Sequence, residues 1–261
     1  MKKIGIVGCG AIGSGIAEFV CKKLRAEARV VALCDIDPKK AKDLSKKITP
    51  HPIVTSIKNL VKKSDLIIEA AGMGISAEIA DEAIFRGKDA LIMSTGGLLK
   101  KPGIFKKAKK KGCNIHIPSG AVCGVDGLRA AGIGKIKKVT LTTRKPPRGL
   151  KGADYLVKKR IDIDKIKKET VIYSGNASGA VKYFPKNINV AATLSLSGIG
   201  PERTTVRIIT SPEYTRNVHE VEVEGEFGKL FTRTENVPSK ANPKTSQMAI
   251  FSALAKIKEL V

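Results

Sequence analysis

Glycines with a fixed spacing are the first residues whose types and order point to a chemical task. The segment from Gly8 to Gly13 reads GCGAIG, a GxGxxG pattern, and it follows a short apolar run. In this pattern the first glycine permits a tight turn, the second lets the backbone approach a pyrophosphate, and the third allows close helix packing. A helix that begins here would also direct its N-terminus at the phosphates. The pattern predicts a dinucleotide site whose cofactor contacts are Gly8, Gly10, Ala11, Ile12 and Gly13.

An acidic side chain stands where such a site requires one. Asp35 follows Gly13 by 22 residues, at the end of a second apolar run. Its carboxylate can accept hydrogen bonds from both ribose hydroxyls of the adenosine half of the cofactor. Lys39 and Lys40 come shortly afterwards and could instead accept a 2′-phosphate. Asp35 favours NAD, and the two lysines leave NADP open.

Small residues follow two further apolar runs, at 70–72 (AAG) and at 94–97 (STGG). In an open parallel sheet, ligands bind at the carboxyl ends of the strands. If the dinucleotide site is accepted, we expect Ala70, Ala71 and Ser94 to contact the nicotinamide half of the cofactor. Ordinary loop chemistry is the alternative explanation for both segments.

Three histidines supply the side chain whose ordinary pKa lies nearest to neutral pH. His219 stands at the start of an expected strand and is the candidate for a general acid or base. His51 lies between two prolines and fits a surface turn, whereas His116 lies in an apolar strand and fits a hydrogen-bonded core residue. The chain has no HExxH motif, no CxxC motif and no paired carboxylates, so we predict no metal site.

The order of the apolar runs predicts the scaffold that positions these residues. Strands are expected at 3–7, 29–34, 64–70, 88–93 and 114–117, and helices at 11–24, from 38 onward behind an Asp37 N-cap, and at 76–85. Short strands that alternate with helices indicate βαβ units. The first part of the chain is therefore predicted to form a doubly wound parallel sheet of Rossmann type.

The pattern changes near residue 118. Strands are expected at 137–143, 203–210, 218–224 and 229–233, and helices at 175–184, 188–196 and 242–260. The strands have alternating or β-branched character, which predicts an antiparallel sheet with helices on one face. The fold class is thus α/β, with a second α+β domain after the Rossmann domain.

The composition is that of a folded protein. The chain has 261 residues, 42% of them hydrophobic, which is enough for one large or two modest domains. No apolar run reaches the roughly 18–20 residues that span a bilayer, and Gly8 and Gly10 interrupt the start of the chain before a signal-peptide core could form. Five scattered cysteines without a CxxC pair argue against a disulfide framework. We expect a soluble cytoplasmic protein with reduced thiols.

The formal net charge of +24 is large for this length. The first 168 residues contain 37 basic and 15 acidic side chains and therefore carry +22 of it. A solvated, lysine-rich surface that steers an anionic ligand is the favoured interpretation. Nucleic-acid binding is the alternative, but aromatic residues make up only 4% and tryptophan is absent, so few bases could stack.

Five segments together resemble the L-aspartate dehydrogenase family of archaea and bacteria. They are GCGAIGSGIAEF from Gly8, IPSGAVCGVDGL from Ile117, FPKNINVAATLSLSGIG from Phe184, HEVEVEGEFG from His219 and NPKTSQMAIFSAL from Asn242. The resemblance implies a Rossmann domain and a substrate domain through which a homodimer forms, with the terminal helix returning to the first domain. We therefore expect a dinucleotide-binding domain at 1–118 and 240–261 and a catalytic and dimerisation domain at 119–239.

The resemblance also implies an activity and three residue roles. Members of the family oxidise L-aspartate to iminoaspartate with NAD or NADP. The iminoaspartate hydrolyses to oxaloacetate and ammonia or feeds NAD biosynthesis through quinolinate, and reductive amination is the reverse reaction. At the matching positions, Ala121 and Asn189 would contact the cofactor and His219 would be the acid/base residue.

A dicarboxylate substrate needs cationic or amide groups to hold it. Ser119, Lys186 and Asn187 are the candidates for substrate binding, with the backbone amides near Ser119 included. Asn187 would serve equally well as the N-cap of the helix that follows it.

Two other interpretations stay open. A related two-domain reductase, such as a homoserine dehydrogenase or a dihydrodipicolinate reductase, shares the βαβ start, although the segments from Phe184 and His219 argue against it. A nucleic-acid-binding regulator with the dinucleotide as a sensor ligand is motivated by the charge alone. The choice between NAD and NADP and the physiological direction of the reaction stay open as well.

Overall fold

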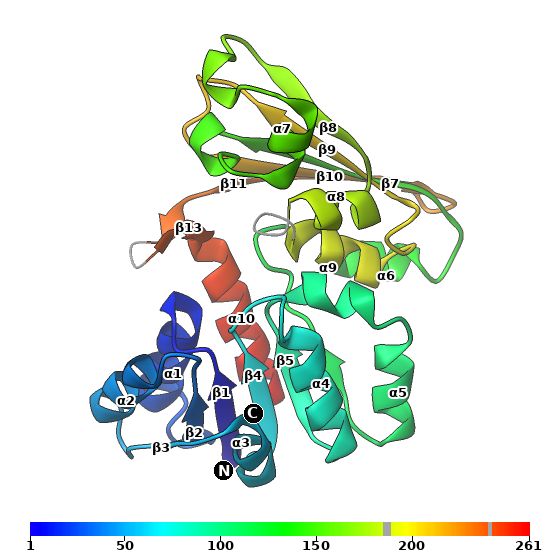
Figure 1. Cartoon of the computed structure of the whole chain (residues 1–261). Coiled ribbons are helices and arrows are strands. Elements are labelled where there is room, and N and C mark those ends of the chain that lie inside the picture. Colours follow the sequence, from blue (N-terminus) through cyan, green and yellow to red (C-terminus); the bar gives the residue numbers. More distant parts are fainter. Residues whose placement is uncertain (185–188, 240–241) are drawn as a thin grey trace. The chain divides into compact units, whose positions relative to one another are not determined.

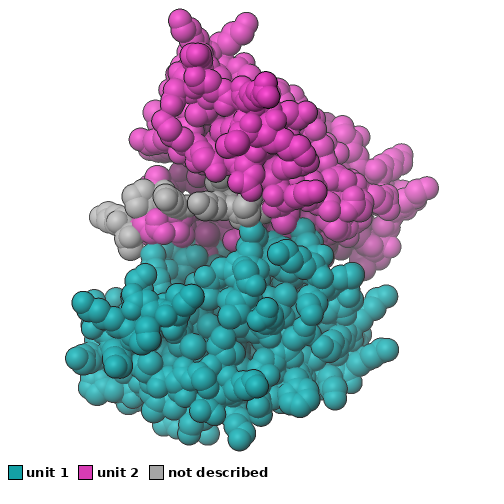
Figure 2. Space-filling view, viewed as in Figure 1, with its two compact units in different colours: residues 1–118, 250–261 teal, residues 119–249 magenta. Residues whose placement is uncertain are grey.

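The computed structural model describes residues 1–184, 189–239 and 242–261. The chain divides into two compact units, of which unit 1 comprises 1–118 and 250–261 and unit 2 comprises 119–249 (Figure 2). Within the described ranges, no helix has both the length and the hydropathy that a membrane crossing requires.

A six-stranded parallel sheet forms the centre of unit 1, with the order β3-β2-β1-β4-β5-β6 (Figure 1). Its strands are β1 Lys2–Val7, β2 Ala28–Cys34, β3 Ile53–Val54, β4 Leu66–Glu69, β5 Asp89–Ile92 and β6 Ile115–His116. All of the pairs are parallel. This is the predicted doubly wound sheet. Strand β3 was not predicted, because two residues are too short to give a periodic signal.

Helices cover both faces of this sheet. They are α1 Ala11–Lys23, α2 Pro38–Lys47, α3 Ile57–Lys63, α4 Ser76–Phe85, α5 Ile104–Lys110 and the terminal α10 Gln247–Leu260, together with the 3-10 helix η1 Thr95–Lys100. The predicted N-cap is confirmed, because the Asp37 side chain accepts a hydrogen bond from the Lys39 N–H at 3.0 Å.

Alternation along β1 explains how the two faces differ. Ile4 and Ile6 belong to a core cluster that also contains apolar residues of α1, α2 and α10. Gly5 points to the opposite face, where a Cβ would lie 2.4 Å from a methyl carbon of Leu60 in α3. The missing side chain at Gly5 thus lets α3 pack directly on the strand.

Unit 2 is built on a five-stranded sheet with the order β11-β10-β7-β9-β8. The strands are β7 Ile136–Lys145, β8 Thr170–Asn176, β9 Thr204–Thr210, β10 Asn217–Gly225 and β11 Gly228–Asn236. The expectation of an antiparallel sheet was wrong in one pair, because β7 and β9 run parallel. The chain leaves β7, forms β8 at the sheet edge and returns through helices, so that β9 starts at the same end as β7.

The remaining elements of unit 2 are helical except for one short ribbon. The helices are α6 Val125–Ala131, α7 Asp154–Lys159, α8 Ala177–Tyr183 and α9 Asn189–Ser197, with 3-10 turns η2 Pro147–Gly149 and η3 Ile163–Lys165. Helices α8 and α9 pack on β9, and α6 packs on α9. The cover on this face of the sheet agrees with the α+β expectation.

The terminal helix begins later than expected. Residues 242–246 form strand β13 (Asn242–Ser246), which pairs with β12 (Pro238–Ser239), and α10 starts only at Gln247. The Gln247 N–H donates to the carbonyl of Val237 at 2.9 Å, and the Ser246 hydroxyl donates to Asn236 Oδ1 at 2.5 Å. These bonds hold the segment along the preceding chain, so it cannot continue the helix.

Candidate functional site

The glycine loop between β1 and α1 has the geometry that its pattern predicts. Gly8 has a φ of +97°, and a Cβ there would lie 2.4 Å from the carbonyl of Ala70. A Cβ at Gly13 would lie 1.8 Å from Gly8 O, so only glycine fits either position. Around Gly10, by contrast, no heavy atom of the described residues lies within 4 Å of where a Cβ would stand. This open backbone, ahead of the helix N-terminus, fits the close approach of a phosphate group.

A cavity of about 530 Å³ opens at the carboxyl ends of β1, β2 and β4. It brings together five of the predicted cofactor contacts, namely Gly8, Gly10, Asp35, Ala70 and Ala71. The other lining residues are Val7, Cys34, Ile36, Lys40, Ile57, Gly72, Gly74 and Ile75. Its size and place suit part of a dinucleotide, because ligands of open α/β sheets bind at this edge.

Asp35 is held at the wall of this cavity by backbone groups. Its Oδ2 accepts from the Cys9 N–H at 2.6 Å, and its Oδ1 accepts from the Asp37 N–H at 2.8 Å. Burial, together with the Asp35 charge, raises the pKa of the Cys9 thiol to about 12, so this thiol is neutral at physiological pH. Lys40 also lines the cavity, so a carboxylate and an amine both border it.

The other predicted residues of unit 1 are not among those that line the cavity. Ala11 and Ile12 are the first two residues of α1. Ser94 is buried and precedes η1, and both its N–H and its hydroxyl donate to Glu69, at 2.9 and 2.8 Å. Glu69 itself was not predicted as a site residue, because a single acidic residue in an apolar strand carries no pattern.

His219 lies on β10 and is 4% exposed. Its ring Nδ1 lies 3.0 Å from the hydroxyl of Thr143 on the neighbouring strand β7, in direct cross-strand register. Burial and the nearby charge of Lys145 lower the pKa of His219 to about 3. The imidazole is therefore neutral at physiological pH and can accept a proton.

The sheet face that carries His219 is apolar at one end and polar at the other. At the apolar end, Leu141 pairs with Val221, and both are buried. Two residues further along β7, at positions 143 and 145, the same face becomes polar. The buried polar side chains there are Thr143 and Lys145 of β7, Thr210 of β9, His219 of β10, and Thr234 and Asn236 of β11. Burial of so many polar groups is costly and indicates a binding or catalytic site.

Of this cluster the sequence analysis named only His219, and Lys145 is the other ionisable member. It is 7% exposed, and burial lowers the pKa of its amino group to about 8. Thr234 pairs with His219 across the sheet, and its hydroxyl is buried without a hydrogen-bond partner among the described residues. A buried hydroxyl of this kind beside a histidine suits a polar ligand.

The remaining predicted residues of unit 2 have different environments. Ala121 is buried, and its carbonyl accepts a hydrogen bond from Asn236 Nδ2 at 3.0 Å. Ser119 is half-buried, and Asn189 is the exposed first residue of α9. Lys186 and Asn187 lie outside the described residues.

For the two other histidines, one prediction agrees with the structure and the other does not. His51 is exposed, as expected for a surface turn, and its Nδ1 lies 2.9 Å from Ser45 O. The expectation that His116 is a hydrogen-bonded core residue was wrong, because its buried Nε2 has no partner within the described part of the chain. His116 lies on β6, a two-residue strand at the sheet edge, and burial lowers the pKa of its ring.

Solved structures with the same architecture include two dehydrogenases. Aspartate dehydrogenase from Thermotoga maritima matches with a TM-score of 0.76 and 23% identity, over 100% of this chain and 97% of that one. A homoserine dehydrogenase from Thiobacillus denitrificans matches with a TM-score of 0.63 and 15% identity, over 99% of this chain and 73% of that one. At these identities the likeness shows the fold.

Sequence comparison is more specific. Residues 8–118 match the family model "Homoserine dehydrogenase, NAD binding domain", and residues 126–260 match "Aspartate dehydrogenase, C-terminal". L-aspartate dehydrogenases from Methanosarcina mazei and Methanosarcina acetivorans are 46% and 47% identical, over 100% of this chain and 97% of each relative. The second family model spans more than half of the chain, and these relatives span all of it. The chain therefore belongs to the L-aspartate dehydrogenase family.

Proposed function

We propose that the protein oxidises L-aspartate to iminoaspartate with NAD or NADP as the hydride acceptor. The iminoaspartate would hydrolyse to oxaloacetate and ammonia or supply NAD biosynthesis through quinolinate, and reductive amination of oxaloacetate is the reverse. The observation that carries the proposal is the group of buried polar side chains formed by His219, Thr143 and Lys145, which lie on one face of the sheet of unit 2. The names of the curated relatives support the same substrate.

The residues of unit 1 would hold the cofactor. The open backbone at Gly10 and the N-terminus of α1 suit the pyrophosphate, and Asp35 suits the adenosine ribose. The nicotinamide ring, when bound, supplies the site that accepts the hydride from Cα of the substrate. Asp35 favours NAD over NADP, because its negative charge opposes a 2′-phosphate.

The residues of unit 2 would bind and deprotonate the substrate. Lys145 provides a desolvated cation for one carboxylate of aspartate, and the buried hydroxyl of Thr234 provides a donor beside His219. Thr143 bonds Nδ1 of His219, so we assign the proton of the substrate amine, or of the attacking water, to Nε2.

Substrate binding would also activate the histidine. In the free protein burial lowers the pKa of His219, and the charge of Lys145 lowers it further. A substrate carboxylate that neutralises Lys145 removes the second effect, and the pKa of His219 then rises. His219 would thus become a stronger base when aspartate is present.

The test is to follow NADH and NADPH absorbance with L-aspartate and a panel of amino acids that includes homoserine. We expect L-aspartate alone to reduce the cofactor well. The His219→Ala variant should lose on the order of 10²–10⁴ in rate, the usual contribution of a general acid or base. If the wild type binds NAD but oxidises homoserine rather than aspartate, the proposed substrate is wrong. If aspartate reacts and His219→Ala is unimpaired, the proposed base is wrong.

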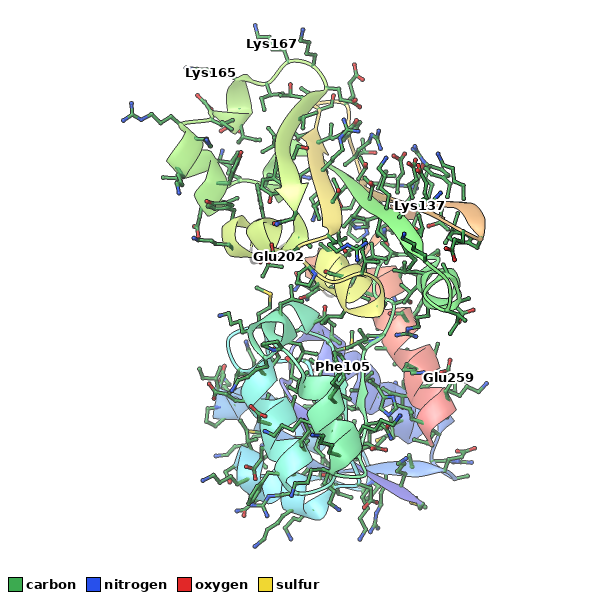
Figure 3. All side chains as sticks on the ribbon, turned by 90° about the vertical axis from the view of Figure 1, so that its right-hand side faces the viewer. Phe105, Lys137, Lys165, Lys167, Glu202 and Glu259 are labelled. Carbon is green, nitrogen blue, oxygen red and sulfur yellow. The ribbon has the colours of Figure 1, made fainter. Side chains whose placement is uncertain are left out.

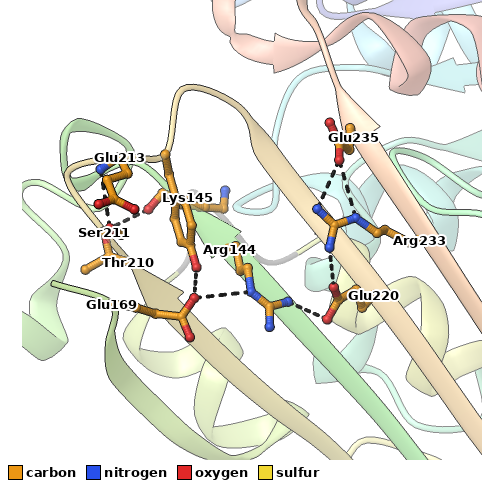
Figure 4. Close-up of polar contacts among 10 residues, drawn as sticks. Arg144, Lys145, Glu169, Thr210, Ser211, Glu213, Glu220, Arg233 and Glu235 are labelled. Atoms are coloured by element: carbon orange, nitrogen blue, oxygen red, sulfur yellow. Dashed lines mark hydrogen bonds and ion pairs between the residues drawn. The ribbon is translucent and has the colours of Figure 1, made fainter.

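We also propose a homodimer that forms through the other face of the second sheet. Arg144, Glu220, Arg233 and Glu235 form a chain of ion pairs there (Figure 4). The face contains a hollow of about 300 Å³, and Phe231 beside it is 55% exposed. Alternating charges around an exposed aromatic ring suit a second copy of the same face, since a two-fold interface must be self-complementary. Light scattering should give the mass of a dimer for the wild type and of a monomer for Phe231→Glu.

The lysine-rich surface and the free thiols fit this function. Lys137, Lys165 and Lys167 are examples of exposed lysines on unit 2, and Figure 3 shows how such side chains extend from the ribbon. A positive field raises the rate at which an anion such as aspartate arrives. We propose a cytoplasmic location, which the five cysteines support because they form no disulfide in the part of the chain described.

A further inference from the structure

Glu69 is a buried carboxylate to which the proposed reaction gives no role. It is the last residue of β4 and is 0% exposed. Its Oε1 accepts from the N–H groups of Ala71 and Gly72 and from Ser94 Oγ, each at 2.8 Å, and its Oε2 accepts from the Ser94 N–H at 2.9 Å. Four donors from two separate loops therefore converge on one side chain.

These partners suit the ionised form of Glu69. Three of the four are backbone N–H groups, which can bond to an oxygen lone pair but not to the proton of a carboxylic acid. Burial raises the pKa of Glu69, and the four hydrogen bonds oppose that rise. An ionised carboxylate can be buried only where such donors surround it, so the loops and the charge stabilise each other.

Two further contacts join the same loops. The hydroxyl of Ser76 donates to Ser94 O at 2.9 Å. Gly97 lies so close to Met73 that a Cβ would stand 2.5 Å from Met73 O. Residues 70–76 after β4 and 94–97 after β5 thus form one unit, which we call the two-loop platform, and the Glu69 carboxylate lies beneath it.

The platform borders the cofactor cavity. Ala70, Ala71 and Gly72 line it together with the glycine loop and Asp35. In a sheet of the order 3-2-1-4-5-6, the first three strands receive the adenosine half of a dinucleotide, and the other three receive the nicotinamide half. Residues 94–97 follow β5 and therefore belong to the nicotinamide half, whereas residues 70–72, which follow β4, also line the cavity beside Asp35.

We propose that Glu69 is a positioning residue for the nicotinamide half of the cofactor. It holds the two-loop platform in the conformation that receives the cofactor and does not touch the cofactor itself. This inference rests on the proposed dinucleotide site and adds to it a residue that acts only through the platform.

The test compares ligands that use one half or both halves of the site. Glu69→Gln keeps the size of the side chain, but its NH₂ group faces an N–H donor in either orientation of the amide. Binding of NAD⁺ and of ADP to the full-length protein is measured by calorimetry, with thermal unfolding as a check on folding. The control is Glu82→Gln, because Glu82 pairs with Arg86 on α4 and does not line the cavity.

We expect Glu69→Gln to bind NAD⁺ about tenfold more weakly, since loop residues must then be ordered during binding. ADP affinity should fall less than NAD⁺ affinity, because ADP lacks the nicotinamide half and meets only the part of the platform that lines the cavity beside Asp35. Glu82→Gln should bind both ligands like the wild type. A role in stability alone would lower the unfolding temperature without separating NAD⁺ from ADP.

Ser94 provides a second, independent test. Ser94→Ala removes one donor to Glu69 and should weaken NAD⁺ about threefold while sparing ADP. In the Glu69→Gln background the same change should have little further effect, because both variants disturb one network. If the two effects are additive, Ser94 acts independently of Glu69 and the positioning role is refuted.

Two other results would overturn the inference. One is a folded Glu69→Gln protein that binds NAD⁺ like the wild type, and the other is an equal loss of NAD⁺ and ADP. If Glu69→Gln does not fold, Ser94→Ala alone decides, and unchanged NAD⁺ binding in that variant refutes the role. Failure of the wild type to bind NAD⁺ would instead refute the dinucleotide site on which the inference rests.

Discussion

Replacing Lys145 by methionine should stabilise the free protein. In the fold, burial lowers the pKa of Lys145 from 10.5 to about 8, so the unfolded chain binds more protons between these two pH values. Over this window the free energy of unfolding of the wild type therefore rises with pH. At pH 7 the charged amino group costs the folded state up to about 3 kcal/mol, because one pKa unit corresponds to about 1.4 kcal/mol. Methionine has a similar length and no charge, so the variant avoids this cost.

The pH dependence of the difference is the sharper measurement. Changes in packing and hydrogen bonding add a constant to the difference in stability between Lys145→Met and the wild type, whereas the contribution of the charge changes with pH. The advantage of the variant should fall by about 1 kcal/mol between pH 7 and pH 9. Urea unfolding at both pH values measures it. The control is Lys137→Met, an exposed lysine on the same strand (Figure 3), which should stay within about 0.5 kcal/mol of the wild type.

The same variant should lose function while it gains stability. If Lys145 binds a substrate carboxylate, its removal should raise KM for L-aspartate by on the order of a hundredfold, the value of a charged hydrogen bond. The affinity for NAD⁺ should not change, because the cofactor cavity is lined by residues of unit 1. A stability difference that is the same at pH 7 and pH 9 would refute the buried charge, and an unchanged KM would refute its role in binding.

Three further predictions follow from the geometry of the two sites. Thr143→Val should lower kcat roughly tenfold, because Nδ1 of His219 loses the hydroxyl that orients the ring, and steady-state kinetics measures this. Gly13→Ala should lower the free energy of unfolding by several kcal/mol, because its Cβ would collide with the Gly8 carbonyl, and thermal unfolding measures this. Gly10→Ala should unfold like the wild type but bind NAD⁺ on the order of tenfold more weakly in calorimetry. Asp35→Ser should raise the affinity for NADP relative to NAD by about tenfold, measured by titration with both cofactors, because a 2′-phosphate then meets no negative charge.

The fold of unit 1 could be predicted because its signals are local. Each strand is a short apolar run, and the order of strands and helices then allows one right-handed winding. The glycine pattern also predicts the backbone geometry of the loop between β1 and α1, since at Gly8 and Gly13 a side chain would collide with the backbone. The mixed sheet of unit 2 was harder to predict, because no local sequence pattern in β7 or β9 indicates that these two strands pair in parallel.

The ionisable residues of unit 2 differ in how easily each could be identified from the sequence. His219 is one of three histidines, so its residue type alone draws attention to it. Lys145 is one of 48 basic residues, and only its register marks it, since it lies on the same face as Thr143 and opposite Thr210. Its neighbour Arg144 points to the other face and forms ion pairs with Glu169 and Glu220 there. Because side chains alternate between the two faces of a strand, a shift of one residue decides whether a basic side chain here lies in the buried polar cluster or on the opposite face.

Glu69 extends this argument to a single acidic residue. In the sequence it ends the apolar run LIIE, where an exposed strand end and a buried charge look the same. The cost of burying a carboxylate depends on donors that come from elsewhere in the chain, in this case from a loop 25 residues away at Ser94. Residues whose stability depends on distant partners leave no local pattern, yet they are the ones that hold loops in place for a ligand. The two ionisable residues that sequence reasoning misses at these sites, Glu69 and Lys145, are both buried, and this is the physical reason that a structure adds most where the chemistry is densest.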